Sequence, residues 1–217
     1  HLGGDEVNTD CWTTTSHIKH WLQERNMTAQ DAYQYFVIKA QEIATSKKWT
    51  PVNWEETFLS FPSKLDPKTV VHNWLTDGVC AKAVAQGFRC IFSNQGVWYL
   101  DHLDVPWYSV YRAEPLNGTQ TASHQKLVIG GEVCMWGETA DPGDLQQTIW
   151  PRAAAAAERL WSSRESTPSD AAHLAATVLP RLHYFRCLLN QRGISAAPVS
   201  NFYARSPPSG PGSCYDQ

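Results

Sequence analysis

Short apolar runs alternate with helical patterns along most of the chain. A capping-box pattern at Thr28 and Asp31 opens the first long stretch in which apolar residues recur at three- and four-residue spacing. The segments that we interpret as helices are 28–43, 78–86, 151–161 and 180–193. The segments that we interpret as strands are 50–56, 69–75, 88–93 and 127–136. Strands that alternate with helices predict an α/β fold with a parallel sheet.

Aromatic or acidic residues stand at or just beyond the end of each predicted strand. They are Trp54 with Glu55, Trp74, Tyr99, and Trp136 with Glu138. In a (β/α)8 TIM barrel the active site lies at the carboxyl ends of the strands. If His1–Gly4 ends one more strand, the chain holds roughly the C-terminal five of eight strand–helix units, and we predict such a partial barrel. Periodicity leaves a flavodoxin-like open sheet of five strands as the alternative.

The organisation of the chain favours one domain rather than two. No internal repeat or long linker divides it, so we predict that residues 1–217 are the C-terminal part of a single barrel domain. Residues 194–217, with a Pro- and Gly-rich tail, are predicted to be an irregular extension. The chain begins with His1 rather than Met, and its first residues should end a strand. We therefore expect an N-terminal domain and the first barrel strands to be missing.

Charge and composition exclude several classes of partner. The formal net charge is -3, which gives no basic excess for nucleic acid or an anionic membrane surface. No apolar run reaches the roughly 20 residues that a membrane-spanning helix needs. The 10 Trp are typical of carbohydrate binders, because sugar C–H faces stack on aromatic rings. Large aromatic side chains that fill a core are the alternative, and composition alone does not decide between them.

Cysteines and glycosylation sequons indicate the secretory pathway. The 6 Cys permit disulfides and show no CxxC spacing of the zinc type. Asn26 and Asn117 each begin an Asn-x-Thr sequon. We expect a protein of the secretory pathway that is glycosylated at both asparagines.

The segment His1-Leu2-Gly3-Gly4-Asp5-Glu6 carries the sharpest chemical signal. Two glycines allow the backbone to turn abruptly at the end of a strand, and two adjacent carboxylates follow. A carboxyl group at that position can act as a general acid. A Gly-Gly turn followed by two solvated acidic residues is the alternative for this motif taken alone.

Six segments together resemble one enzyme family, the β-N-acetylhexosaminidases of glycoside hydrolase family 20. In family order they are 1–6 with Cys11-Trp12, then 52–56, 98–101, 130–138, 150–161 and 183–187. The resemblance covers essentially the whole chain and is strongest to the eukaryotic lysosomal, vacuolar and secreted enzymes. It implies that residues 1–217 are part of the catalytic barrel. It also implies removal of terminal β-linked N-acetylglucosamine or N-acetylgalactosamine from glycans.

The resemblance implies three catalytic residues and no cofactor or metal. Glu6 would protonate the glycosidic oxygen and later act as the base for water. Asp5 would orient the substrate's own 2-acetamido group, whose oxygen attacks the anomeric carbon, so the enzyme supplies no nucleophile. Tyr99 would donate a hydrogen bond to that acetamido oxygen. The expected result is hydrolysis with retained configuration through an oxazolinium intermediate.

The resemblance also implies five substrate-binding residues. Trp54, Trp74 and Trp136 would enclose the acetamido methyl group and stack beneath the sugar. Asp101 and Glu138 would accept hydrogen bonds from hydroxyl groups at the non-reducing end. Asp101 resembles the form of the family that prefers neutral sugars, because a carboxylate would repel a 6-sulfated sugar. Four other tryptophans are expected to pack in the core: Trp12, Trp49, Trp107 and Trp161.

The cysteines divide into an implied pair and unassigned residues. Cys187 and Cys214 resemble the family's C-terminal pair, so a bridge between them is implied. Cys134 lies in a predicted strand and is expected to be a buried thiol. The sequence leaves a Cys80–Cys90 bridge open.

Two other functional interpretations remain open at this point. One is a sugar-binding relative without catalytic activity; the presence of Asp5, Glu6 and Tyr99 is evidence against it. The other is that the chain as given is an inert fragment, since an incomplete barrel leaves open sheet edges and an uncovered core. Family habit implies a homodimer for the complete protein, and the charge balance leads us to expect no nucleic-acid or membrane partner.

Overall fold

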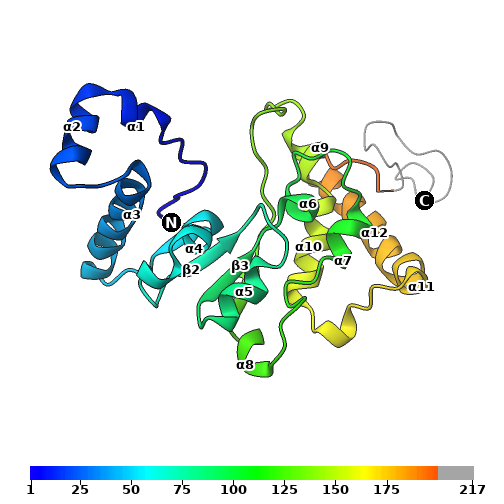
Figure 1. Cartoon of the computed structure of the whole chain (residues 1–217). Helices are drawn as coiled ribbons and strands as arrows, with labels where there is room; N and C mark the ends of the chain where they lie inside the picture. Colours follow the sequence, from blue (N-terminus) through cyan, green and yellow to red (C-terminus); the bar gives the residue numbers. More distant parts are fainter. Residues whose placement is uncertain (200–217) are drawn as a thin grey trace. The chain divides into compact units, whose positions relative to one another are not determined.

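The computed structural model describes residues 1–199 and contains a parallel sheet with helices (Figure 1). The strands are β1 (Val52–Trp54), β2 (Val70–Asn73), β3 (Arg89–Phe92) and β4 (Val128–Gly131), in the order β1-β2-β3-β4. The β1–β2 and β2–β3 pairs are parallel. Before β1, Leu2 N donates to Val52 O at 2.8 Å and Gly3 O accepts from Trp54 N at 3.1 Å. The first residues therefore pair with β1 as a neighbouring strand would.

Short and medium helices connect and follow the strands. The α-helices are α1 (Asp10–Thr14), α2 (Ser16–Glu24), α3 (Ala29–Ser46), α4 (Glu55–Ser60), α5 (Val79–Ala85), α6 (Gln95–Trp98), α7 (Trp107–Arg112), α8 (Ala122–Gln125), α9 (Leu145–Ile149), α10 (Arg152–Trp161), α11 (Ala171–His173) and α12 (Leu179–Gln191). Two 3₁₀ turns, η1 (Pro62–Lys64) and η2 (Arg164–Ser166), and one π-helical turn, η3 (Leu174–Val178), complete the set within residues 1–199.

The chain forms two compact units. The first contains residues 1–92 and 116–129, and the second contains residues 93–115 and 130–199. The helix predicted from the capping box is α3, and the reciprocal Thr28–Asp31 bonds are present. In the first unit α5 packs against β2 and β3 (Figure 1). The core of this unit is made of Tyr33, Val37, Phe58, Phe61, Leu65, Val71, Val79, Ala83 and Phe88.

A disulfide joins α5 to β3. Cys80 and Cys90 are bridged, with their Cα atoms 5.4 Å apart. Both residues are buried, next to Val84. The bridge that the sequence left open is therefore present, and it ties a helix to the strand that follows it.

In the second unit α10 packs against α7, and two buried arginines anchor α10. The Arg159 guanidinium donates to Tyr111 O at 2.8 Å, to Thr167 Oγ1 at 2.8 Å and to Ser169 Oγ at 2.6 Å. The Glu114 carboxylate lies 3.7 Å from Nη1 of Arg159, so a partly buried acidic group also faces this guanidinium. The second buried arginine is Arg152. Its guanidinium donates to backbone carbonyl groups of the loop after α6, which carries the predicted site residues Tyr99 and Asp101.

Several local predictions differ from the structure. The strand predicted over 50–56 ends at Trp54, because Glu55 begins α4. The strand predicted over 127–136 ends at Gly131, and Cys134 forms only an isolated parallel bridge with Tyr99. Cys134 is half-buried, and burial raises the pKa of its thiol to about 12. Trp49, which follows α3, and Trp161, the last residue of α10, were expected in the core but are 73% and 90% exposed.

Candidate functional site

The Gly3-Gly4 turn places the two acidic residues immediately after the segment that pairs with β1. Both glycines have positive φ, +66° and +99°. A Cβ on Gly4 would lie 2.5 Å from Cγ2 of Thr57, which is buried, so no other residue fits there without displacement. Tyr33 donates its hydroxyl hydrogen to Gly4 O. The turn is therefore held from two sides, and Asp5 follows it directly.

Asp5 and Glu6 differ in their surroundings. Asp5 is half-buried, and its charge helps to raise the pKa values of Tyr33 and Glu56, although burial is the largest cause for both. The pKa of Tyr33 rises to about 12, so this phenol stays protonated and remains a donor. Glu6 is exposed and adopts φ +48°, which is uncommon for a residue with a side chain. Within residues 1–199 no hydrogen bond or ion pair of the Glu6 side chain is found.

A histidine that the sequence analysis did not select supports the Trp54 ring. His72 in β2 is almost completely buried and stacks on Trp54, with centroids 4.1 Å apart and planes 26° apart. Its Nδ1 lies 3.1 Å from Nε2 of His1. Burial lowers the pKa of His72 to about 4, so the ring is neutral near neutral pH. His1, Trp54 and His72 thus form one aromatic cluster beside the Gly-Gly turn.

The second predicted wall residue of the first unit, Trp74, stands close to Trp54. Their ring centroids are 6.3 Å apart and their planes meet at 68°. The Trp74 Nε1–H donates to Glu56 Oε2 at 3.0 Å. Its backbone N–H donates to Glu55 Oε2 at 2.8 Å. The structure therefore brings together two of the three predicted tryptophan walls, and both lie at the carboxyl ends of neighbouring strands.

In the second unit, Tyr99 and Trp136 come together. Their ring centroids are 6.0 Å apart, and Tyr99 is buried. Backbone bonds on either side of Tyr99 hold it against Cys134: Leu100 N donates to Cys134 O at 2.8 Å, and Cys134 N donates to Trp98 O at 2.9 Å. Trp136 is partly exposed.

Asp101 is a largely buried carboxylate next to this pair. Its Oδ1 is buried and has no hydrogen-bond partner among the described residues. Its Oδ2 lies 3.8 Å from Nε2 of His102. A buried carboxylate oxygen without a donor is costly, so a bound hydroxyl group would stabilise it. Glu138, by contrast, is exposed, and the described part of the chain gives its side chain no hydrogen bond or ion pair.

Arg152, which the sequence analysis did not select, holds the loop after Tyr99. Its Nη1 donates to His102 O at 2.8 Å and to Val105 O at 3.0 Å. Its Nη2 donates to Leu100 O, and to Thr148 O at 2.8 Å. One buried guanidinium thus fixes the backbone on both sides of Asp101. An Arg in a run of helical alanines is the only sequence signal for this role.

The remaining site predictions stay predictions. Asn26 and Asn117 are exposed, as acceptors for glycosylation must be. Cys187 is buried in α12, and Cys214 lies outside the described residues. Among residues 1–199, no helix has both the length and the apolar character to span a membrane.

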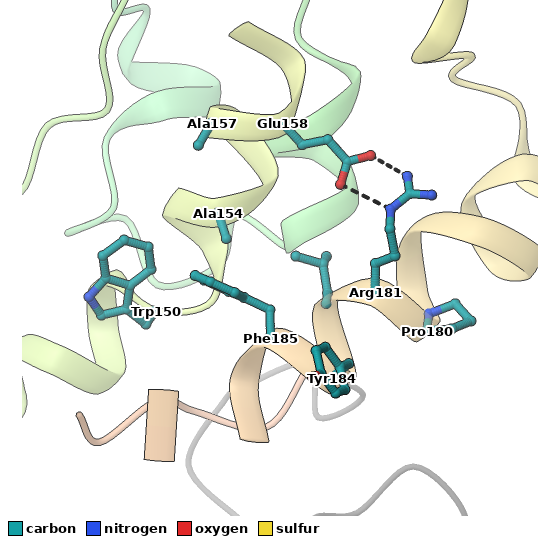
Figure 2. A pocket seen from close by; sticks show the side chains of 9 residues that line it. Trp150, Ala154, Ala157, Glu158, Pro180, Arg181, Tyr184 and Phe185 are labelled. Carbon is teal, nitrogen blue, oxygen red and sulfur yellow. Dashed lines mark hydrogen bonds and ion pairs between the residues drawn. The ribbon is translucent and has the colours of Figure 1, made fainter. Parts of the chain in front are cut away.

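A separate apolar pocket lies between α10 and α12, with a volume of about 660 Å³ (Figure 2). Trp150 and Phe185 line it with their ring centroids 6.2 Å apart, and the Glu158–Arg181 ion pair stands at one side. None of the predicted catalytic or sugar-binding residues lines this pocket. It is therefore distinct from the candidate site.

Comparisons with known proteins agree with the family resemblance. Residues 1–164 match the catalytic domain of glycosyl hydrolase family 20. The chain is 70% identical over all 217 residues to Beta-hexosaminidase 1 of Arabidopsis thaliana, and 55% identical to Beta-hexosaminidase 3 of the same plant. It spans 40% of the length of each of these relatives.

A solved structure gives the same result for the fold. The chitobiase of Flavobacterium johnsoniae aligns with a TM-score of 0.73 and 28% identity, over 90% of this chain and 30% of that one. The sequential order of parallel strands is that of a (β/α)8 barrel and differs from the flavodoxin order, so the barrel prediction is confirmed. This chain belongs to glycosyl hydrolase family 20 and comprises part of that family's catalytic barrel.

Proposed function

We propose that this chain carries the catalytic carboxylates of an exo-β-N-acetylhexosaminidase. The substrate would be a glycan that ends in β-linked N-acetylglucosamine or N-acetylgalactosamine. The observation that carries the proposal is the Gly3-Gly4 turn, which presents Asp5 and Glu6 directly after the segment that pairs with β1 in a family 20 chain. The named function of the Arabidopsis relatives supports the same activity.

The proposed reaction uses the substrate's acetamido group as the nucleophile. Its carbonyl oxygen attacks the anomeric carbon while Glu6 donates a proton to the departing glycosidic oxygen. The bond to the leaving group breaks and an oxazolinium ion forms, which Asp5 stabilises through the acetamido N–H. Glu6 then removes a proton from water, water attacks the anomeric carbon, and the acetamido group is restored. Two inversions give net retention.

Five further residues would bind the terminal sugar. Tyr99 would donate its hydroxyl hydrogen to the acetamido oxygen, and its fixed backbone supports that role. Trp54 and Trp74 would enclose the acetamido group, and Trp136 would stack beneath the ring. Asp101 would accept a hydrogen bond from a sugar hydroxyl at its Oδ1, which is buried and has no donor within residues 1–199. Glu138 would accept from a neighbouring hydroxyl group.

The decisive experiment uses the complete enzyme, by which we mean the protein that carries this chain together with the rest of its catalytic domain. Hydrolysis of an aryl β-N-acetylglucosaminide is compared with hydrolysis of the aryl β-glucoside that lacks the acetamido group. Hydrolysis of the first alone is expected. Equal hydrolysis of both would indicate an enzyme nucleophile, and hydrolysis of neither would favour a non-catalytic sugar-binding relative.

Matched variants assign the roles. Glu6→Gln and Asp5→Asn should each lower kcat/KM by several orders of magnitude, whereas Glu42→Gln, on the exposed face of α3, should leave it unchanged. Residues 1–217 alone are expected to show little activity, because the sheet would have open edges.

We also propose that the complete enzyme is a homodimeric glycoprotein of the lysosome, the vacuole or the extracellular space. Removal of N-glycans from protein made in a eukaryotic secretory system should increase its gel mobility. Asn26→Gln and Asn117→Gln should each remove one glycan, so each variant should show part of that increase in gel mobility before any enzymatic treatment. Unchanged mobility would contradict the proposed compartment.

A further inference from the structure

Two consecutive glutamates at the start of α4 both reach the loop that follows β2. Glu55 is fully buried, and its carboxylate accepts four hydrogen bonds. The donors are Asn73 Nδ2 at 2.6 Å, Trp74 N at 2.8 Å, Leu75 N at 3.1 Å and Thr76 N at 2.8 Å. Four donors compensate the charge of a carboxylate that is shielded from water. Glu55 therefore fixes the backbone of the loop after β2, including that of Trp74.

Glu56 contacts the same residue at its side chain. Its Oε2 accepts from the Trp74 Nε1–H at 3.0 Å. Glu56 is half-buried, and burial raises its pKa, whereas the indole bond lowers it. A hydrogen bond to a half-buried carboxylate is stronger than one to a neutral acceptor. Because the donor is the indole N–H, this bond restrains the rotation of the Trp74 ring as well as its position.

We propose that Glu55 and Glu56 are positioning residues that together orient Trp74 for substrate binding, Glu55 through the backbone and Glu56 through the ring. The inference rests on the proposed function, in which Trp74 encloses the acetamido group. The two residues do not touch the reacting atoms. Their effect passes through one tryptophan, so it should appear in substrate binding more than in the chemical step.

A double-mutant cycle on the complete enzyme tests the link between Glu56 and Trp74. Trp74→Phe keeps an aromatic ring but removes the N–H donor. With Trp74 present, Glu56→Ala should raise KM for an aryl β-N-acetylglucosaminide about tenfold with a much smaller change in kcat. In the Trp74→Phe background the same change should add less than about twofold. Independent, multiplicative effects in the two backgrounds would overturn the proposal.

Conservative replacements separate positioning from general damage. Glu56→Gln keeps an acceptor oxygen and should restore KM to within about threefold of the unmodified enzyme. Glu55→Gln replaces one acceptor with an NH₂ group that faces backbone donors, so it should raise KM and lower the melting temperature. Val37→Ala in the core should lower the melting temperature without changing KM. A Glu55→Gln enzyme with unchanged KM would contradict the role of Glu55.

A spectroscopic measurement keeps the inference testable if the catalytic proposal fails. In ¹⁵N-labelled protein the Trp74 indole N–H resonance, assigned by its loss in Trp74→Phe, should shift in Glu56→Ala and return towards its original position in Glu56→Gln. If the enzyme hydrolyses neither aryl substrate but the resonance behaves in this way, the proposed function fails and the positioning of Trp74 stands. If the resonance does not move, the positioning fails by itself.

Discussion

His72 lies face to face with Trp54, and its Nδ1 is 3.1 Å from Nε2 of His1. A buried, neutral imidazole in β2 therefore supports one predicted wall of the sugar site and contacts the first residue of the catalytic segment. The arrangement couples the protonation of one histidine to the packing of the site.

The stability of the complete enzyme should decrease as the pH falls from about 6.5 to about 4. Burial lowers the pKa of His72 to about 4, below the usual value of 6.5, so between these values the unfolded chain binds the proton more readily than the folded chain. Stability is therefore fully present above 6.5 and is lost on acidification through this window. Melting temperatures at several pH values should show the loss, and His72→Gln should make it shallower. Identical slopes in the unmodified enzyme and in His72→Gln would contradict the assignment.

Gly4→Ala should destabilise the enzyme more than Gly87→Ala does. Both positions have similar φ, +99° and +87°, so both substitutions carry a backbone cost of about 1–2 kcal/mol. Only at Gly4 does the new methyl group meet Thr57 Cγ2, at 2.5 Å, which should add about 1–3 kcal/mol. Denaturant unfolding measures both. Thr57→Ser, which removes Cγ2, should recover part of the loss at Gly4; equal losses at the two glycines would show that contact with Thr57 is unimportant.

Arg152→Lys should lower both stability and activity. A lysine cannot reach the carbonyl groups of Leu100, His102 and Val105 with one planar group, so the loop around Asp101 would lose its fixed geometry. We expect a loss of about 3 kcal/mol in unfolding free energy and at least a tenfold loss in kcat/KM. Arg181→Gln breaks the partly exposed pair with Glu158 and should cost about 1 kcal/mol or less. Similar losses in the two variants would contradict a special role for Arg152.

A 6-sulfated substrate should be hydrolysed much more slowly than its neutral counterpart. The Asp101 carboxylate has one buried oxygen that receives no hydrogen bond from the described part of the chain, and a sulfate group near it would be repelled. Asp101→Asn should therefore raise the ratio of sulfated to neutral kcat/KM about tenfold, even if both values fall. Asp104→Asn, a nearby exposed carboxylate, should leave the ratio unchanged. Efficient hydrolysis of the sulfated substrate by the unmodified enzyme would refute this preference.

Local sequence patterns were sufficient to predict several helices and strands. The Thr28–Asp31 capping box, the helix that follows it and the strands β1, β2 and β3 are confirmed, because the pattern that predicts each of them lies within a few consecutive positions. The spaced motifs were sufficient to identify the family. The Gly3-Gly4 turn was also readable, since positive φ is an intrinsic preference of glycine.

The tertiary structure decided features that depend on residues far apart in the sequence. The sequence pattern predicts that Glu55 and Glu56 continue the strand that contains Trp54. In the structure they begin α4, and their carboxylates accept hydrogen bonds from Trp74 in the loop after β2. His72 resembles any residue of a buried strand until its stacking on Trp54 is seen. Arg152 shows its role only through carbonyl groups about 50 positions away. The sequence by itself determined the family, the parallel α/β order and the residues that carry the proposed chemistry. Only the fold decided which buried polar groups hold those residues in place. Buried polar groups such as Glu55 and Arg152 need hydrogen-bond partners, and those partners lie on other segments of the chain.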